Sequence, residues 1–312
     1  MATTKPASTP APPTPTPKPD KVSFATTTIG GADMPALVAM KKGFFAQENV
    51  EAELVTMRTD VSLKAMVAGE IGFIIGLDSS VRAAVQGLPV KVLMATIDKP
   101  YHELVVRPEI KEGKDLKGKT IGIASAAGTT ENMARAALEH YGLDPDKDAT
   151  FTVMGDSGQR LAAVKGGGVQ GAILSPPATF QAEAMGLKRM LKIADIMESP
   201  LGGINTSDKL IKERPDLVLR VIRGSLKGLA YIKDPKNKDE LINLWVTEAK
   251  NTKEDATAAY PDNVRSYSDN SGILSDKVMQ QEIDRAKKTG DVKGDVPISQ
   301  VFDYSFVQKA RQ

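Results

Sequence analysis

The chain has 312 residues, of which 41% are hydrophobic and 26% charged, enough for two globular units that each hold a core. Its 41 basic and 39 acidic residues are interspersed and leave a net charge of +2, and 5% of the residues are aromatic, so the composition argues against nucleic-acid binding. Cysteine is absent, which excludes disulfides, thiolate metal sites and thiol nucleophiles and fits an oxidising compartment.

Residues 1–20 are predicted to form a disordered tether. They contain seven of the 19 prolines of the chain, and such a segment can neither bury apolar area nor pair its backbone. A proline-rich ligand for a recognition domain is the alternative. No apolar run approaches the roughly 18–20 residues of a membrane span, and no signal peptide opens the chain. We expect a precursor with a signal sequence or a lipid-bearing cysteine upstream of Met1.

The first core strand is expected at 22–26, followed by a turn and a helix. Asp33 is a typical helix cap, and Pro35 fits the first turn of a helix. Gly30 and Gly31 let the backbone approach a polar or anionic group at the helix N-terminus. A tight turn explains the same glycines equally well. The candidate binding residues in this turn are Gly31, Ala32 and Asp33.

The stretch 159–177 repeats the stretch 61–79 at an offset of 98 residues: Leu161 falls on Leu63, and Gly167 falls on Gly69. Each copy predicts a short amphipathic helix that ends at glycine. An apolar run follows that is short enough for a buried parallel strand. Similar segments precede both copies, so the sequence predicts two α/β lobes, although any two α/β units share part of this pattern.

Polar turns follow the repeated strands and supply further candidates. They are Asp78 and Ser79 in the first copy, and Ser175 and Pro176 in the second. Tyr101 lies in a loop between strands expected at 90–95 and 103–106. Only two histidines are present, His102 and His140, and neither has a second ligand at a suitable spacing, so no metal site is predicted.

Residues 113–120 (GKDLKGKT) match the phosphate-binding pattern G-x-x-x-x-G-K-[ST]. A nucleotide-binding loop follows a strand and leads into a helix, whereas this motif precedes the strand expected at 120–124, so we reject it. The turn after that strand is a better anion site, because Thr129 and Thr130 lie beside the free amides of a helix expected at 131–140. Thr130 acting only as a cap is the alternative. The next strand-to-helix turn carries Asp156 and Ser157.

The remainder of the chain is predicted to be largely helical. Pro215 opens a helix with one apolar face, and further helices are expected near 241–247, 256–260, 275–288 and 298–310. No third copy of the repeat is visible. We therefore expect this region to pack on the first lobe.

Three stretches together resemble the substrate-binding proteins of ABC importers. They are AMKKGFFAQENVEAELV at 39–55, DLKGKTIGI at 115–123 and GVQGAILSPP at 168–177. The nearest branch captures alkanesulfonates, nitrate, thiamine-pyrimidine precursors, riboflavin or aromatic acids. The resemblance covers residues 21–215 well and the C-terminal helices loosely. Gln170 stands where relatives often carry an acidic residue. The residues with which characterised relatives recognise their ligands cannot be located in this sequence by a shared motif.

The resemblance implies a type II periplasmic-binding fold: duplicated α/β lobes, a hinge of two crossover strands and a helical C-terminal region packed on lobe one. We place the crossovers near 106–111 and 199–203, which assigns 21–107 and 204–312 to lobe one and 108–203 to lobe two. The implied function is capture of a small molecule, a vitamin-like heterocycle or an organic anion, for an ABC permease. We expect a periplasmic or cell-surface monomer without a cofactor that closes about its hinge.

Ligands of α/β proteins bind at the carboxyl ends of the strands, so the strand-end loops form the predicted site. Its residues are Gly31, Ala32, Asp33, Asp78, Ser79, Tyr101, Thr129, Thr130, Asp156, Ser157, Ser175 and Pro176. Arg58 is the most obvious basic candidate nearby. One rival is an enzyme related to the thiamine-pyrimidine synthases, but the cysteine of those enzymes is missing and no nucleophile elbow or catalytic carboxylate pair appears. A ligand-binding sensor domain is the third possibility.

Overall fold

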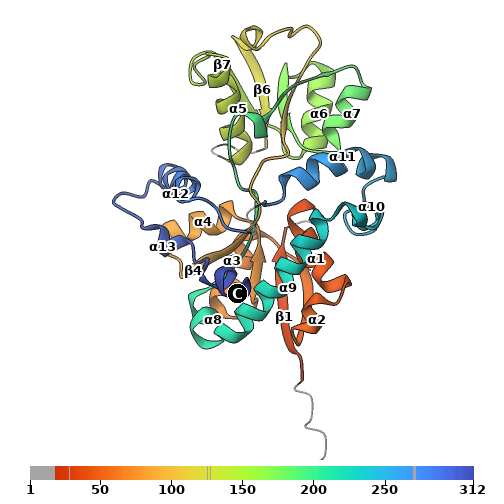
Figure 1. Ribbon diagram of the computed structural model, residues 1–312. Coiled ribbons are helices and arrows are strands. Elements are labelled where there is room, and N and C mark those ends of the chain that lie inside the picture. The colour runs from red at the N-terminus through yellow and green to blue at the C-terminus, as the bar shows by residue number, and fades with distance from the viewer. Residues whose placement is uncertain (1–17, 28, 125, 127, 270–271) are drawn as a thin grey trace, which may run out of the picture.

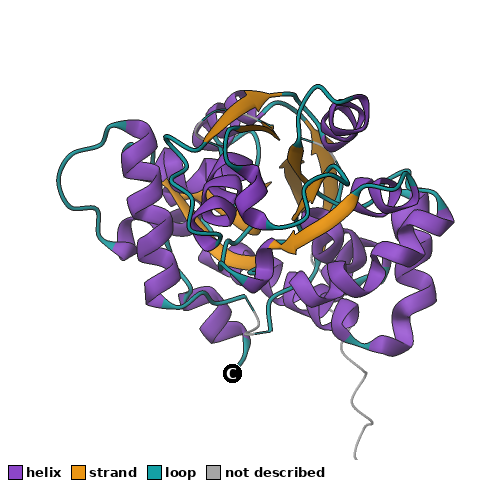
Figure 2. Ribbon diagram, turned by 90° about the horizontal axis from the view of Figure 1, so that it is seen from above, coloured by secondary structure: helices purple, strands orange, loops and turns teal. Residues whose placement is uncertain are grey.

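The computed structural model describes residues 18–27, 29–124, 126, 128–269 and 272–312. Most of the predicted tether, residues 1–17, therefore lies outside the described residues. Two five-stranded sheets form the centres of two lobes, which lie one above the other in Figure 1. Figure 2 shows helices around the outside of the strands. This arrangement confirms the predicted two-lobed α/β architecture.

The two sheets have the same construction. The first contains β2 (Val50–Thr56), β1 (Asp20–Thr26), β3 (Phe73–Ile75), β10 (Gly202–Ser207) and β4 (Val90–Ile97), in that order. The second contains β7 (Ala149–Val153), β6 (Lys119–Ile123), β8 (Gly171–Leu174), β5 (Glu103–Val106) and β9 (Lys188–Lys192). In both, three parallel strands are followed by one antiparallel strand. This equivalence confirms the duplication.

The antiparallel fourth strand of each sheet arrives from the other lobe. β4 ends at Ile97 and β5 begins at Glu103, so residues 98–102 form the first crossover. Residues 196–201 return to β10, close to the predicted second crossover. The predicted first crossover, 106–111, is wrong, because β5 pairs with β8 and β9 in the second sheet. The short apolar run of β5 contains no information about which sheet it will join.

Helices cover both faces of each sheet. On the first sheet, one face carries α1 (Met34–Lys41), α2 (Phe44–Gln47), α8 (Asp208–Glu213), α9 (Pro215–Lys233), α10 (Lys238–Thr247) and α14 (Ser305–Ala310). The other face carries α3 (Thr59–Ala68), α4 (Asp78–Val85), α12 (Asp276–Gly290) and α13 (Ile298–Val301). On the second sheet, α5 (Thr129–His140) lies opposite α6 (Ser157–Gly166) and α7 (Ala178–Ala184). Each sheet is thus covered on both sides, which explains the nearly continuous apolar runs of its central strands β3, β5 and β8.

The C-terminal region packs on the first lobe as expected, with two differences. The helix predicted at 298–310 is wrong: Phe302 forms a β-bridge with Val92, and Asp303 N–H donates to the Val92 carbonyl at 2.9 Å. These contacts separate α13 from α14. In addition, α11 (Lys253–Ser266) lies between the lobes in Figure 1 and contacts the second one, where Lys192 Nζ lies 2.9 Å from Asp262 Oδ1.

Two findings bear on the sequence motifs. Residues 113–116 form a short 3-10 helix, η2 (Gly113–Leu116), and the motif then enters β6, so it does not precede a helix N-terminus as a nucleotide-binding loop does. Across the described part of the chain, no helix is both long and apolar enough to span a membrane.

Candidate functional site

The strand-end loops of the two lobes face each other. β4 runs parallel to β3 and leaves the first sheet at its carboxyl edge. The first residue of β5, Glu103, lies opposite Leu174, the last residue of β8. The first crossover therefore joins the carboxyl edges of both sheets, and its length limits their separation to about 20 Å. The predicted loops lie at these two edges, which is where α/β folds bind ligands.

In the first lobe, residues 31–33 form a 3-10 turn, η1 (Gly31–Asp33), just before α1. Asp33 is only 2% exposed, and its Oδ2 accepts the Gly30 N–H at 2.8 Å. Burial raises the pKa of this carboxyl to about 6. The Tyr267 hydroxyl donates to the Gly31 carbonyl at 2.7 Å. Asp33 occupies the predicted capping position of α1, but its side chain holds the loop and not a helix amide.

Asp78 and Ser79 are the first two residues of α4. Asp78 is already paired: its carboxylate lies 3.1 Å from Arg82 Nη2 and 3.1 Å from Arg285 Nη2 of α12. Arg285 also bonds to Glu282, and burial raises the pKa of that carboxyl to about 7. These two α12 residues line a cavity of about 550 Å³ whose other wall is residues 194–198, at the end of the second lobe and the start of the second crossover. This cavity therefore spans both lobes.

In the second lobe, two predicted serines meet above a buried arginine. Ser157 Oγ and Ser175 Oγ are 2.9 Å apart. Arg160 is 3% exposed, and it donates to Ser157 Oγ at 2.9 Å and to the Ile173 carbonyl at 2.8 Å. Its third nitrogen donates to the Gly155 carbonyl, and burial lowers the pKa of the guanidinium. Within the described chain, no carboxylate forms an ion pair with Arg160.

Sequence reasoning missed Arg160, although a signal was available. The residue lies four positions before Val164, on the face of α6 that is buried. A charged residue on an apolar helical face is unusual and is normally paired or hydrogen-bonded. The helical period could therefore have singled it out.

Other predicted residues of the second lobe hold their own loops. Thr130 is buried, and its Oγ1 accepts the Ala124 N–H at 2.8 Å, while Gly128 occupies the N-cap position of α5. Asp156 caps α6 by accepting the Gln159 N–H at 2.9 Å. Thr129 remains half-buried at the first position of α5. Pro176 begins the turn before α7, and its peptide bond to Pro177 is cis. Ser125 and Ala127 of the α5 turn lie outside the described residues.

The first crossover places two rings between the lobes. Tyr101 and His102 stack with their ring centroids 5.0 Å apart. Burial raises the pKa of Tyr101 to about 12, and the Asp33 carboxylate adds to the shift. Burial lowers the pKa of His102 to about 3, and the Arg160 guanidinium adds to that shift. The crossover thus brings Asp33 of one lobe and Arg160 of the other into a single electrostatic environment.

A further cavity of about 550 Å³ opens at the ends of β1 and β2. It is lined by Thr27, Thr56, Met57, Arg58, Thr59 and Asp60. The Arg58 side chain is 83% exposed, and its Nε lies 3.0 Å from Asp60 Oδ1. The predicted basic candidate is therefore a solvated side chain with an acidic neighbour.

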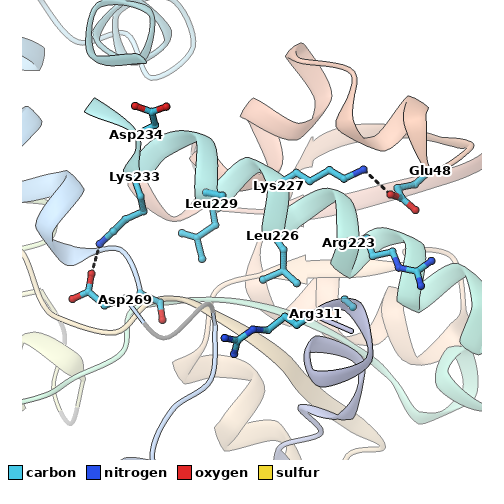
Figure 3. Close-up of a pocket in the computed structure, with 12 residues that line it drawn as sticks. Glu48, Arg223, Leu226, Lys227, Leu229, Lys233, Asp234, Asp269 and Arg311 are labelled. Atoms are coloured by element: carbon cyan, nitrogen blue, oxygen red, sulfur yellow. Dashed lines mark hydrogen bonds and ion pairs between the residues drawn. The ribbon is translucent and has the colours of Figure 1, made fainter. Parts of the chain in front are cut away.

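A cavity of about 710 Å³ lies elsewhere, along α9 (Figure 3). Leu226 and Leu229 line it, and Lys227 pairs with Glu48 at one end, at 2.7 Å. Lys233 and Asp269 form an ion pair at the other end. None of the predicted site residues lines this cavity, so its size does not make it the ligand site. Over the described ranges, no three His, Asp or Glu side chains gather as a metal site.

Similarity to known proteins agrees with this arrangement. Residues 32–238 match the family described as NMT1/THI5 like. The chain belongs to this family. It is 29% identical to the riboflavin-binding protein RibY of Chloroflexus aurantiacus over 226 residues, which is 69% of this chain and 63% of RibY. The match therefore spans less than two thirds of that relative's length.

Two solved structures share the fold across nearly the whole chain. The periplasmic aliphatic sulphonate binding protein SsuA of Escherichia coli has a TM-score of 0.73 at 16% identity, covering 91% of this chain and 97% of SsuA. The periplasmic nitrate-binding protein NrtA of Synechocystis PCC 6803 has a TM-score of 0.70 at 14% identity, covering 94% and 88%. The predicted periplasmic-binding fold is confirmed.

Proposed function

We propose that this protein is an extracytoplasmic solute-binding protein that captures a small organic molecule between its lobes and delivers it to an ABC importer. The observation that carries the proposal is the pair of short crossovers, which holds two equivalent sets of strand-end loops face to face. The relatives support it, since their names describe binding of riboflavin, sulphonate and nitrate.

The site offers suitable chemistry for such a ligand. Tyr101 supplies an aromatic ring in the first crossover, and Ser175, which is hydrogen-bonded to Ser157, supplies a hydroxyl from the second lobe. Micromolar affinity requires about 8 kcal/mol. Burying about 150 Å² of an apolar ring provides about 4 kcal/mol, and several hydrogen bonds provide the rest. The ligand we propose is a vitamin-like heterocycle or an organic acid. Closure about residues 98–102 and 196–201 would present the occupied form to the permease.

We propose binding without turnover. The two serines of the site hydrogen-bond to each other, and Ser157 also accepts a hydrogen bond from Arg160. A guanidinium cannot accept a proton from a serine, so this arrangement does not activate a nucleophile as a histidine base would. An enzyme related to thiamine-pyrimidine synthesis remains the second candidate, because the family description includes THI5.

A monomer in the periplasm or at the cell surface is part of the proposal. The word periplasmic in the names of SsuA and NrtA supports the compartment. Membrane attachment through residues 1–20 stays a prediction from the sequence.

Native mass spectrometry with a panel of riboflavin, ethanesulfonate, nitrate, a pyrimidine and benzoate tests the proposal. A true ligand is retained unchanged and, at 100 times its dissociation constant, adds about 2.7 kcal/mol to the free energy of unfolding, which raises the melting temperature by several degrees. Small-angle scattering should show a smaller radius of gyration when it binds. Chemical conversion of the compound would favour the enzyme, and a panel without any binding would contradict the ligand classes proposed.

A further inference from the structure

The direction of the hydrogen bonds around Ser157 can be worked out from its neighbours. Ser157 Oγ has three polar contacts: Arg160 Nη2 at 2.9 Å, the Ser175 backbone nitrogen at 3.2 Å and Ser175 Oγ at 2.9 Å. The guanidinium and the backbone N–H can only donate. A serine oxygen accepts two hydrogen bonds and donates one. The hydroxyl of Ser157 must therefore donate to Ser175 Oγ.

This order determines what Ser175 can do. Its oxygen accepts the proton of Ser157, so its own O–H points to a different partner. No hydrogen bond from this O–H to another described residue is present. Ser175 is half-buried and follows Leu174, which lies opposite Glu103 at the end of the first crossover. With respect to the described residues, this proton is therefore available at the edge of the sheet that faces the first lobe.

The charge of Arg160 reinforces this direction. The guanidinium is buried, donates to three oxygens of its own lobe, and has no ion-pair partner along the described chain. A donor chain that begins at a cation strengthens the hydrogen bond at its far end, because each hydroxyl is polarised by the one before it. A positively charged or donor-only ligand group at Ser175 would meet both an unmatched donor and the positive charge of the buried Arg160.

We propose that Ser175 donates a hydrogen bond to an oxygen of the ligand, and that Arg160 and Ser157 are positioning residues that hold Ser175 in the donor state. The ligand group read by the second lobe is a carbonyl, carboxylate or sulfonate oxygen, and not an amine or ammonium. This inference rests on the proposed function, and it restricts the ligand to compounds that present a hydrogen-bond acceptor to Ser175.

The test is isothermal titration of riboflavin, ethanesulfonate and benzoate into the wild type and into three variants, Ser175→Ala, Ser157→Ala and the double variant. For a compound that the wild type binds, Ser175→Ala should raise the dissociation constant about 10- to 100-fold. Ser157→Ala should raise it less. The double variant should bind as Ser175→Ala does, because Ser157 acts only through Ser175.

Several measurements separate this role from a structural one. Ser157→Thr retains the hydroxyl and should bind as the wild type does, and Ser23→Ala, which removes a surface hydroxyl bonded to Glu53, should change nothing. Melting temperatures check that every variant is folded. Equal affinities of the wild type and Ser175→Ala, or additive effects in the double variant, would overturn the inference and leave the proposed function standing. Failure of all three compounds to bind the wild type would contradict the ligand classes proposed and, with them, this inference.

Discussion

Helix α9 packs on α1 so closely that Gly228 has no room for a side chain. A Cβ built on Gly228 would lie 2.0 Å from the Pro35 carbonyl oxygen, well inside the 3.0 Å below which such contacts are essentially never seen. The obstructing atom belongs to the backbone of the first turn of α1, so a change of rotamer cannot relieve it. We predict that Gly228→Ala forces the two helices apart.

The expected effect has two opposing parts. Alanine in place of glycine inside a helix adds about 1 kcal/mol of stability when the site is open. Overpacking in a well-packed interior costs about 1–3 kcal/mol, and a clash with backbone belongs at the upper end. We therefore expect Gly228→Ala to lower the free energy of unfolding by about 1–2 kcal/mol. It should also weaken ligand binding, because Pro35 lies two residues beyond Asp33 and a shift of α1 moves the η1 turn.

Urea unfolding measures the first effect, and the single tryptophan, Trp245, is buried in α10 and reports on the first lobe. The matched control is Gly166→Ala at the end of α6, where nothing lies within 4 Å of the added Cβ. That variant should gain up to about 1 kcal/mol by circular dichroism. A Gly228→Ala protein as stable as the wild type would refute the reasoning.

Two other predictions concern buried charges. Arg189→Met should lower the unfolding free energy by about 3 kcal/mol, because it leaves Glu103 as an unpaired buried carboxylate. Glu103 is 4% exposed and is bonded to Arg189 at 2.6 and 2.7 Å. The exposed control Arg58→Met should unfold at the urea concentration of the wild type, and equal losses of stability in the two variants would contradict the role of burial. The pKa of Asp33 is about 6 in the folded protein and 3.8 as the ordinary value for the unfolded chain, so the folded state binds this proton more tightly. The protonated carboxyl therefore adds to the free energy of unfolding below pH 4, and this contribution is lost as the pH rises through 6. The stability of the wild type relative to Asp33→Asn should thus fall by about 2 kcal/mol between pH 4 and 6, measured by urea titrations at each pH. The lowered pKa of His102 makes stability rise with pH, but it does so equally in the wild type and in Asp33→Asn and cancels in the comparison. A stability difference between the two proteins that does not vary with pH would show that Asp33 does not titrate in this range.

Local patterns predicted most of the elements. The repeated stretches became α3 and β3 in one lobe and α6 and β8 in the other, and the helices of the repeat keep the offset of 98 residues, since α3 starts at Thr59 and α6 at Ser157. Glycine ended both helices in the left-handed conformation, at Gly69 and Gly167. These features depend on neighbours in sequence, which is why a single chain is enough to predict them.

Errors arose where a segment depends on distant partners. The sequence interpretation assigned β5 to the first lobe and predicted residues 298–310 as one helix. Pairing with β8 and β9 decides the first case, and the bridge between Val92 and Phe302 decides the second. Of the site candidates, Thr130 and Asp156 proved to support their own loops.

The amino-acid sequence by itself determined that this protein has two related α/β lobes, where their strands and helix ends fall, and which loops carry polar residues, because periodicity and glycine positions act over a few residues. Only the tertiary structure decided that the carboxyl edges of the two sheets face each other and that Arg160 lies beneath Ser157 and Ser175. Hydrogen-bond direction and burial depend on groups brought together from separate segments, and such groups have no fixed spacing along the chain.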